Sequence, residues 1–389
     1  MSERLRLGTM EIAVLLALAG LLGLGLTTLA RIGLPVEAGF DSQLVRQSVF
    51  AVLGVGVLFV MAYSDYRALS IIAWALYWLG LVALVLVLFF GVTRYGSQRW
   101  FLLGPIQFQP SELAKFTTIV LLARYFARRQ DQPIGFKAFL LSGLIPAGPV
   151  FLIFIQPDLG TALIFVVIWL AIAFIGGARL PHLGLVLILG LAAMPLAWFV
   201  MKPYMRERIV TFFDPTIDPL GAGYNVLQAR IAVGSGGWWG RGIGEATQSQ
   251  LEFLRVRDTD FIFAVVAEQL GFVGALAVLT FFTILLAYAL VTAVRAPDDF
   301  GRFLAGGVLS MLSFEVFISI GMNIGIAPVT GIALPMLSSG GSSLVMTLVA
   351  IGAVMSVSMH KGLPLFNPPT RIGVGAGRRH FGRRRHVLS

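Results

Sequence analysis

Cysteine is absent from this chain of 389 residues. Disulfide bonds and thiolate metal sites are therefore excluded, whatever the redox state of the compartment. Charged residues are also scarce, at 12% of the chain, whereas about a quarter of the residues of a soluble domain are charged. Hydrophobic residues make up 57% of the chain and the mean hydropathy is +0.87, so a soluble fold of this composition would aggregate.

A cleavable signal sequence is missing as well. The first apolar run, near residues 10–30, is long enough to span a bilayer and shows no processing signal, so we expect it to be retained as a first membrane helix. The apolar runs predict ten transmembrane helices, near residues 10–30, 46–63, 70–92, 112–127, 138–155, 159–177, 181–201, 261–293, 301–325 and 342–360. Of these ten runs, the one at 112–127 is the least apolar, so its helix is the weakest prediction.

The even number of helices places both termini on one side of the membrane. If that side is the cytoplasm, 17 of the 29 Lys and Arg residues lie inside and 12 outside, with 7 of those 12 in the long segment 202–257. Long translocated segments report poorly on orientation, so the bias of the remaining residues places the termini inside. The sequence thus predicts an all-α polytopic inner-membrane protein, with outer segments near 93–111, 202–260 and 326–341.

Two regions are expected along the chain: a ten-helix membrane domain over residues 1–365, with its large outer loop between the seventh and eighth helices, and a basic cytoplasmic tail over 366–389. Much of the net charge of +10 falls in this tail. A basic tail after a last membrane helix sets topology and contacts anionic lipid. Because no aromatic interleaving or nucleic-acid fold accompanies it, we expect no nucleic-acid partner.

Histidine is scarce, and in this topology every histidine falls on the cytoplasmic side. The four are His182, His360, His380 and His386. No Ser-His-Asp or Cys-His arrangement and no His-ligated zinc can therefore form on the outer face. Chemistry there depends on carboxylates, Lys, Arg, hydroxyls and amides, and we expect no organic cofactor.

The outer segment 202–260 combines Asp-Pro turns and many glycines with aromatic residues, which is typical of a functional loop that packs back onto the membrane domain. Asp260 closes this loop just before the eighth helix. A carboxylate there can simply cap the helix, but Thr259 is itself a capable cap. An ionisable group at the membrane boundary is a functional hypothesis by default. Asp258 is a second candidate, and we favour Asp260 because the apolar run begins directly after it.

Further charged residues of the outer segments are candidates for binding an anionic substrate. Glu112 and Lys115 are three residues apart at the start of the fourth helix and share a face, so they form either a structural ion pair or the charged lining of a cavity. Arg99 precedes them in the same segment, and Arg206 and Arg208 lie in the long loop.

Two segments interrupt the apolar pattern with proline and glycine: Gln156–Thr161 (QPDLGT) and Ala327–Gly341 (APVTGIALPMLSSGG). Broken backbone at membrane depth is tolerated only where it is buried in protein or lines a cavity. We therefore predict that the second segment is a re-entrant wall of an outward-facing pocket rather than a plain surface loop. Asp158 of the first segment and Ser338 and Ser339 of the second are auxiliary candidates for the site. Glu315 is buried in the ninth helix, where a carboxylate is costly, and the sequence identifies no partner for it.

Six segments together resemble the SEDS family (shape, elongation, division and sporulation), and its RodA or elongation branch more than its FtsW or division branch. The resemblance covers residues 10–365. It implies a ten-helix peptidoglycan glycosyltransferase that polymerises lipid II on the outer leaflet. Its implied partners are a class B penicillin-binding protein, which is a transpeptidase, and other membrane proteins of the elongation complex. The segments are GSQRWFLLGPIQFQPSELAK, QPDLGT, DPTIDPLGAGYNVLQARIAVGSGG, TQSQLEFL, TDFIFAVVAEQLGFVG and PVTGIALPMLSSGGSSL.

The resemblance places the essential aspartate of the family on Asp260, in TDFIF, and its charged residues at the start of the fourth helix on Glu112 and Lys115. The role of the family's glutamate after the loop cannot be carried over, because valine occupies that position. Three departures from the family pattern stand here: Arg255-Val256 for the usual Pro-Glu, Asp258 for the usual His, and Ser319 for the usual Asn.

In the implied reaction, a sugar hydroxyl attacks the anomeric carbon of a second lipid-linked chain and displaces a lipid pyrophosphate with inversion. Asp260 is the expected general base, and such assistance contributes roughly 10² to 10⁴ in rate. The leaving pyrophosphate needs positive charge, and the sequence does not choose among the sources. These are Lys115, Arg99, Arg206, Arg208 and a carboxylate-held divalent cation such as Mg²⁺ or Mn²⁺.

Two other functions fit the composition. A flippase or transporter for lipid II or another polyprenyl-linked sugar would also need a polar outward pocket. Transporters often show inverted repeats, however, and no convincing internal repeat is present. A membrane scaffold for cell-wall enzymes would not require Asp260, Glu112 and Lys115 at all.

Overall fold

The computed structural model describes residues 8–32, 42–94, 97–104, 106–129, 134–218, 223–242, 254 and 258–360. The predicted basic tail and the positions of Arg255 and Val256 lie outside these residues. The helices are α1 (Thr9–Ile32), α2 (Gln43–Tyr63), α3 (Arg67–Phe90), α4 (Pro110–Ala127), α5 (Phe136–Ile155), α6 (Leu159–Ile175), α7 (Leu180–Val200), α8 (Pro203–Phe213), α9 (Tyr224–Ser235), α11 (Ile262–Val294), α12 (Asp299–Ile324) and α13 (Gly341–Met359).

All ten predicted membrane helices are present, each within one helical turn of its predicted limits. Seven of the described helices are long and apolar enough to cross a membrane by length and composition. The thinly apolar α4 is not among them. Most of its side chains are buried by neighbouring helices, including α3, α6 and α12, so this helix needs no lipid-compatible surface.

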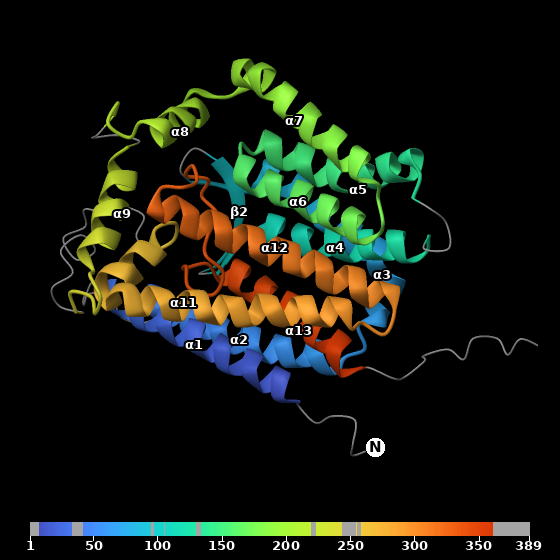
Figure 1. Ribbon diagram of the computed structural model, residues 1–389, viewed down its shortest axis with the longest axis horizontal. Coiled ribbons are helices and arrows are strands. Elements are labelled where there is room, and N and C mark those ends of the chain that lie inside the picture. Colours follow the sequence, from blue (N-terminus) through green and yellow to red (C-terminus); the bar gives the residue numbers. More distant parts are fainter. Residues whose placement is uncertain are drawn as a thin grey trace, which may run out of the picture.

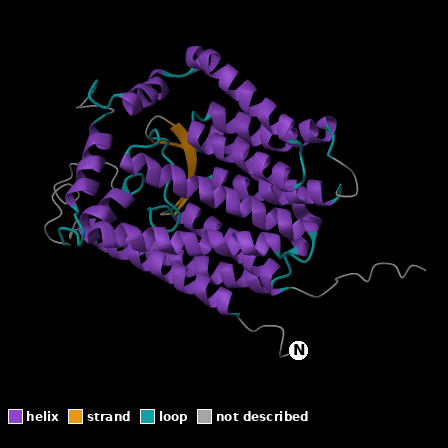
Figure 2. Cartoon of the chain, viewed as in Figure 1, coloured by secondary structure: helices purple, strands orange, loops and turns teal. Residues whose placement is uncertain are grey.

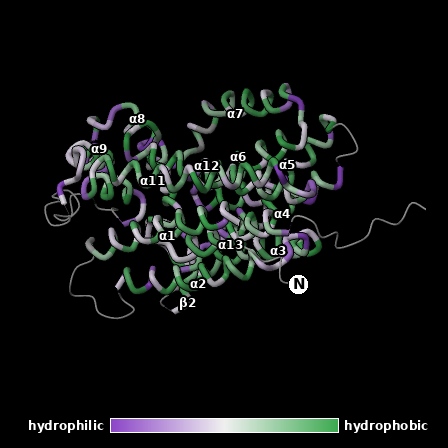
Figure 3. Tube along the Cα trace, turned by 60° about the horizontal axis from the view of Figure 1, so that its bottom comes forward, coloured by the Kyte–Doolittle hydropathy of each residue, from purple (hydrophilic) through white to green (hydrophobic). Residues whose placement is uncertain are grey.

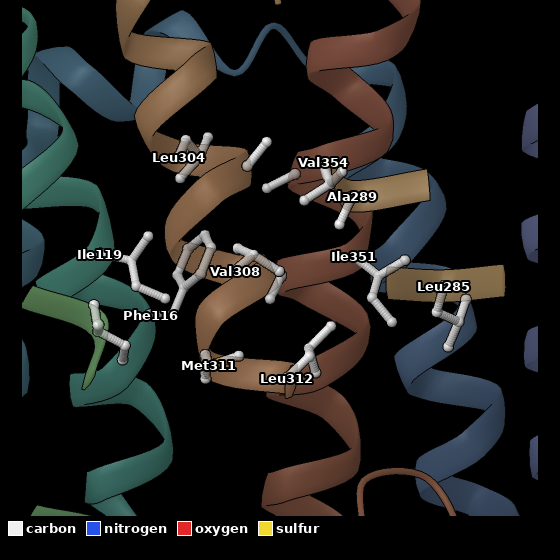
Figure 4. Close-up of a cluster of buried hydrophobic side chains, with 14 of the residues drawn as sticks. Phe116, Ile119, Leu285, Ala289, Leu304, Val308, Met311, Leu312, Ile351 and Val354 are labelled. Carbon is white, nitrogen blue, oxygen red and sulfur yellow. The ribbon is translucent and has the colours of Figure 1, made fainter. Parts of the chain in front are cut away.

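The centre of the bundle is α12, which packs against α4, α6, α11 and α13. Figure 1 shows these helices running roughly side by side across the view. Lipid tails are as apolar as leucine, so helices in a membrane associate through close packing rather than through the hydrophobic effect. Figure 4 shows that packing, with Phe116 of α4, Val308 and Leu312 of α12, Ile351 of α13 and Leu285 of α11 in one buried cluster.

The helix α7 leaves this bundle. Figure 1 shows it diverging towards the top of the view, and from Leu187 onwards its described side chains are exposed. Figure 3 shows that the same helix is hydrophobic along most of its length. An apolar helix with so little protein contact has its sides available to lipid.

The long outer loop contains two helices that the sequence did not predict. The short helix α8 follows α7, and α9 packs back against α11 and α12. Ala229 and Ala232 of α9 join Leu254, Phe261 and Ala264 in a small buried cluster. The expectation that this loop packs onto the membrane domain is therefore confirmed.

The prediction of an all-helical chain omits a small antiparallel sheet, drawn in orange in Figure 2. Its strands are β1 (Val92–Arg94), β2 (Ser97–Leu103) and β3 (Ile106–Phe108), in the order β1-β2-β3. Trp100 pairs with Val92, and Phe101 pairs with Phe108. The paired strands satisfy part of the backbone between α3 and α4 within the segment itself.

We call the end of the bundle that carries the segments expected outside the outer end. It holds the sheet, α8, α9 and the irregular segment 325–340 between α12 and α13. Gly325 ends α12 in the left-handed conformation, with φ 82°. The segment then runs into the protein, where Leu334, Met336 and Leu337 are buried, before α13 begins.

Candidate active site

The outer end of the bundle contains a cavity around Asp260. Its volume is about 190 Å³, and it is bounded by α8, α9, the start of α11 and the segment that follows α12. The outer loop and the predicted re-entrant segment therefore meet at one place. The lining residues are Arg208, Thr211, Phe212, Asn225, Val226, Asp260, Phe261, Ala327, Pro328 and Val329.

The environment of Asp260 favours its protonated form more than water does. Burial raises the pKa of this carboxyl to about 6, and the negative charges of Asp258 and Asp158 act in the same direction. The positive charge of Arg208 and a hydrogen bond from Thr259 oppose the rise. A carboxyl with a pKa of about 6 is mostly ionised at neutral pH and is a stronger base than an ordinary aspartate.

Arg208 and Asp260 both approach Gly331. A Cβ atom placed on Gly331 would lie 3.8 Å from Nη1 of Arg208 and 3.8 Å from Oδ2 of Asp260. Gly331 has φ 75°, so its backbone also favours a residue without a side chain. The arrangement brings a cation and a carboxylate close to one glycine at the cavity.

Arg206 lies on the same helix as Arg208 but is directed elsewhere. It donates a hydrogen bond to the carbonyl of Phe199 at 3.1 Å, and its guanidinium lies 5.8 Å from the ring centre of Trp198. Both partners belong to the end of α7. The structure therefore brings Arg208, and not Arg206, to the cavity.

The turn that carries Asp260 is fastened to the segment between α12 and α13. The N–H of Ser339 donates to the carbonyl of Asp258 at 2.8 Å, and Oγ of Ser338 donates to the carbonyl of Thr259 at 2.6 Å. The Asp258 carboxylate accepts from Oγ of Ser339 at 3.1 Å and from Nε2 of Gln43 at 2.5 Å. Ser338 and Ser339 therefore hold the turn through hydrogen bonds to Asp258 and Thr259.

Lys115 is buried within the bundle and makes two ion pairs. Its Nζ lies 2.9 Å from Oε2 of Glu112, and it also contacts Oε1 of Glu315 on α12. The lysine side chain is 5% exposed, so an anion reaches it only by displacing a glutamate. Neither Lys115 nor Glu112 lines the cavity around Asp260. The contacts agree with the structural ion pair, enlarged by a carboxylate that the sequence left unpartnered.

Arg99 and Asp158 bind each other. Nη1 of Arg99 lies 3.0 Å from Oδ2 of Asp158, and Nε of Arg99 donates to the carbonyl of Gln156 at 3.0 Å. The Asp158 carboxylate also caps α6 by accepting from the N–H of Thr161 at 3.1 Å. Arg99 therefore ties β2 to the turn between α5 and α6.

Sequence reasoning missed several residues that organise this region. Gln47 donates from Nε2 to the carbonyl of Ser338 at 3.1 Å, and its Oε1 accepts from the N–H of Gly340 at 3.2 Å. Asn323 of α12 contacts the turn at Asp260. Glutamines at the start of an apolar helix and an asparagine near the end of another are the only sequence signals, because a buried amide in a membrane requires a partner.

No group of three or more His, Asp or Glu side chains that could hold a metal ion occurs among the residues that the structure describes. The carboxylates of Asp260, Asp258 and Asp158 influence one another electrostatically but belong to different contacts.

Comparison with known proteins agrees with this arrangement. The family model described as cell cycle protein, which covers FtsW, RodA and SpoVE, matches residues 10–363. Peptidoglycan glycosyltransferase MrdB of Escherichia coli K12 is 40% identical over 83% of this chain and 88% of its own length.

Solved structures show the same fold. A chain of a peptidoglycan synthase complex, studied for its coordination of polymerization and crosslinking, aligns with a TM-score of 0.77 at 33% identity and covers 90% of this chain and 98% of its own. Rod shape determining protein RodA of Thermus thermophilus aligns with a TM-score of 0.68 at 31% identity, over 90% of this chain and 97% of its own. The chain therefore belongs to the FtsW/RodA/SpoVE family, the SEDS proteins of the bacterial cytoplasmic membrane.

Proposed function

We propose that this protein polymerises lipid II into glycan strands at the outer face of the membrane. Its E. coli relative is named a peptidoglycan glycosyltransferase, and the two chains share 40% of their residues in the aligned region. The observation that carries the proposal is that Asp260 and Arg208 line one cavity at the outer end and both approach Gly331. This site offers a base and a cation to one substrate.

Asp260 is the general base. The hydroxyl of the acceptor sugar gives its proton to the Asp260 carboxylate while its oxygen attacks the anomeric carbon of the second chain. The bond from that carbon to the pyrophosphate oxygen breaks, and the configuration inverts. A pKa of about 6 leaves the carboxylate ionised at neutral pH and close to the optimum for proton transfer.

Arg208 stabilises the negative charge that develops on the departing pyrophosphate. Its guanidinium is permanently charged and presents several N–H donors to phosphate oxygens. Arg208 lies at the cavity, whereas the contacts of Arg99, Arg206 and Lys115 with other groups direct them away from it. A Mg²⁺ or Mn²⁺ ion carried in with the pyrophosphate would supply additional positive charge.

A class B penicillin-binding protein is the partner that this function calls for. Glycan strands need cross-linking by a transpeptidase, and one solved relative belongs to a synthase complex that coordinates polymerization and crosslinking. The similarity to MrdB and to RodA favours the elongation branch, with other membrane proteins of the elongation complex as further partners.

The test is polymerisation of labelled lipid II by the purified protein with its penicillin-binding partner. Asp260→Asn removes the base without changing the size of the side chain and is expected to abolish strand formation. Asp214→Asn is the matched control, because Asp214 is an exposed carboxylate of the same outer loop.

Glycan strands made by the Asp260→Asn variant at the wild-type rate would contradict the base assignment. A protein that makes no strands in any form, but moves lipid II across a vesicle membrane, would establish the flippase instead. Repeating the wild-type reaction with EDTA, and then with added Mg²⁺ or Mn²⁺, tests the divalent cation.

A further inference from the structure

The first turn of α11 contains an amide from another helix. In a continuous α-helix the N–H of Ala264 would donate to the carbonyl of Asp260, four residues earlier. Here that N–H donates to Oδ1 of Asn323 at 2.9 Å, and the Asp260 carbonyl accepts from Nδ2 of the same side chain at 2.9 Å. The Asn323 amide thus occupies the place of one helical hydrogen bond. The regular pattern resumes one residue later, where the N–H of Val265 donates to the carbonyl of Phe261 at 3.3 Å.

Asn323 is itself fixed. Its side chain is completely buried, and Nδ2 also donates to the carbonyl of Ser319 one turn earlier on α12, at 2.7 Å. Both polar atoms of the amide are therefore used. A buried group with this many partners has one preferred orientation, because any rotation leaves a donor or an acceptor unsatisfied.

The consequence falls on Asp260. The carbonyls of Asp258 and Thr259 are held by the segment after α12, and the carbonyl of Asp260 is held by Asn323, so every residue of this turn is fixed through its backbone. The turn stays open instead of winding into the helix. An open turn lets the Asp260 side chain point to the cavity and to Arg208 rather than along the surface of α11.

We propose that Asn323 is a positioning residue for the reaction: its amide inserts into the first turn of α11 and sets the direction of the Asp260 carboxylate. The inference rests on the proposed role of Asp260 as base. Only asparagine and glutamine offer an N–H donor and a carbonyl acceptor on one planar group, and glutamine is one methylene longer.

The same helix, α12, also holds Lys115. Glu315, two turns before Asn323 on α12, binds Lys115 of α4. The helix α12 therefore contacts both α4 and the start of α11. These contacts keep Lys115 and Asp260 in a constant arrangement, although the two residues are about 150 positions apart in the sequence.

The experiment compares Asn323→Ala, Asn323→Asp and Ser319→Ala with the wild type in lipid II polymerisation from pH 5.5 to 8.5, in the complex with the penicillin-binding partner. Ser319→Ala is the matched control. Its hydroxyl is equally buried one turn away and has no hydrogen-bond partner among the described residues, so its loss disturbs no contact. Gel filtration and thermal unfolding report the folded fraction of each variant.

Asn323→Ala is expected to lower kcat about 10²-fold, the usual effect of a misplaced catalytic group, with KM changed much less. Asn323→Asp keeps the size of the side chain but replaces the donor. When its new carboxyl group is protonated it can still donate to the Asp260 carbonyl, and when it ionises it cannot. The loss of kcat in Asn323→Asp, relative to the wild type at the same pH, is therefore expected to grow as the pH rises. The loss of kcat in Asn323→Ala is expected to stay constant with pH.

Two results would overturn the positioning role: a wild-type kcat for Asn323→Ala, or a defect in Asn323→Ala confined to the folded yield. Asp260→Asn is measured in parallel. If that variant is active, the proposed base is wrong; if it is inactive while Asn323→Ala turns over normally, only the positioning role of Asn323 is wrong.

Discussion

Replacing Arg208 with alanine should move the pH dependence of the reaction upwards. Arg208 lowers the pKa of Asp260, which is about 6 with the arginine in place. Without that charge the carboxylate holds its proton to higher pH, so less of the base is available at neutrality. The rising limb of kcat/KM, which follows ionisation of the base, then shifts to higher pH.

The structure bounds the size of the shift. Nη1 of Arg208 and Oδ2 of Asp260 each lie 3.8 Å from the same point above Gly331, so they are at most twice that distance apart, about 7.6 Å. Two unit charges at this separation interact by about 0.5 kcal/mol in water and about 2 kcal/mol at an effective dielectric constant near 20. Because 7.6 Å is the largest possible separation, these energies are lower limits. With 1.36 kcal/mol per pKa unit, the midpoint should rise by at least about 0.4 pH units at the dielectric constant of water and at least about 1.6 at a constant near 20.

The assay is the initial rate of labelled lipid II polymerisation at subsaturating substrate, measured in steps between pH 5 and 9. Arg208→Lys keeps the charge and should leave the midpoint close to that of the wild type. Arg206→Ala, two residues away on the same helix, should not move it, because that side chain is directed to α7. An unchanged pH midpoint of kcat/KM in Arg208→Ala would mean that Arg208 does not lower the pKa of the base, and it would refute the proposed interaction between Arg208 and Asp260.

Three other outcomes follow from the same contacts. Asp260→Asn should raise the free energy of unfolding at pH 8 by up to about 3 kcal/mol, and with it the thermal midpoint, because the folded protein no longer holds a carboxylate whose pKa is raised from 3.8 to about 6. This gain in stability should disappear below about pH 4, where the wild-type carboxyl is neutral in both the folded and the unfolded state. A gain that persists at that pH would refute the explanation by the raised pKa. Lys115→Ala should reduce the folded yield at least as much as the turnover, since breaking a buried ion pair costs about 3 to 5 kcal/mol, and Glu315→Gln should be milder; fluorescence-detected gel filtration separates yield from turnover. Gly331→Ala should lose most polymerisation with little loss of folded protein, because a methyl group there would contact both Arg208 and Asp260 and strains a backbone at φ 75° by about 1 to 2 kcal/mol. Normal turnover would show that substrate does not approach Gly331.

Hydrophobicity carries most of the information about the fold. Ten runs of apolar residues gave ten helices at nearly the right limits, because in a bilayer every backbone polar group must be satisfied within its own segment. The helices α8 and α9 and the small sheet were missed, because they lie in outer segments where water permits many conformations. Their limits depend on what they pack against, as α9 does on α11 and α12.

The sequence likewise predicted part of the candidate site, and the structure supplied the rest. Excluding histidine and cysteine from the outer face left a carboxylate as the base, and the position before an apolar run selected Asp260. Sequence alone left Lys115, Arg99, Arg206 and Arg208 as equal candidates for the phosphate. Their partners, which lie up to 200 positions away along the chain, separated them.

The sequence by itself determined that this is a polytopic membrane protein with a carboxylate at its outer face, since these properties follow from residue type and local order. Only the tertiary structure decided which groups meet that carboxylate. Arg208 reaches Asp260 from α8, and Asn323 and Gly331 reach it from the end of α12 and the segment that follows, both far from Asp260 in the sequence. Such contacts depend on how the helices pack around α12, and the local pattern of one segment contains no information about the side chains that another segment brings beside it.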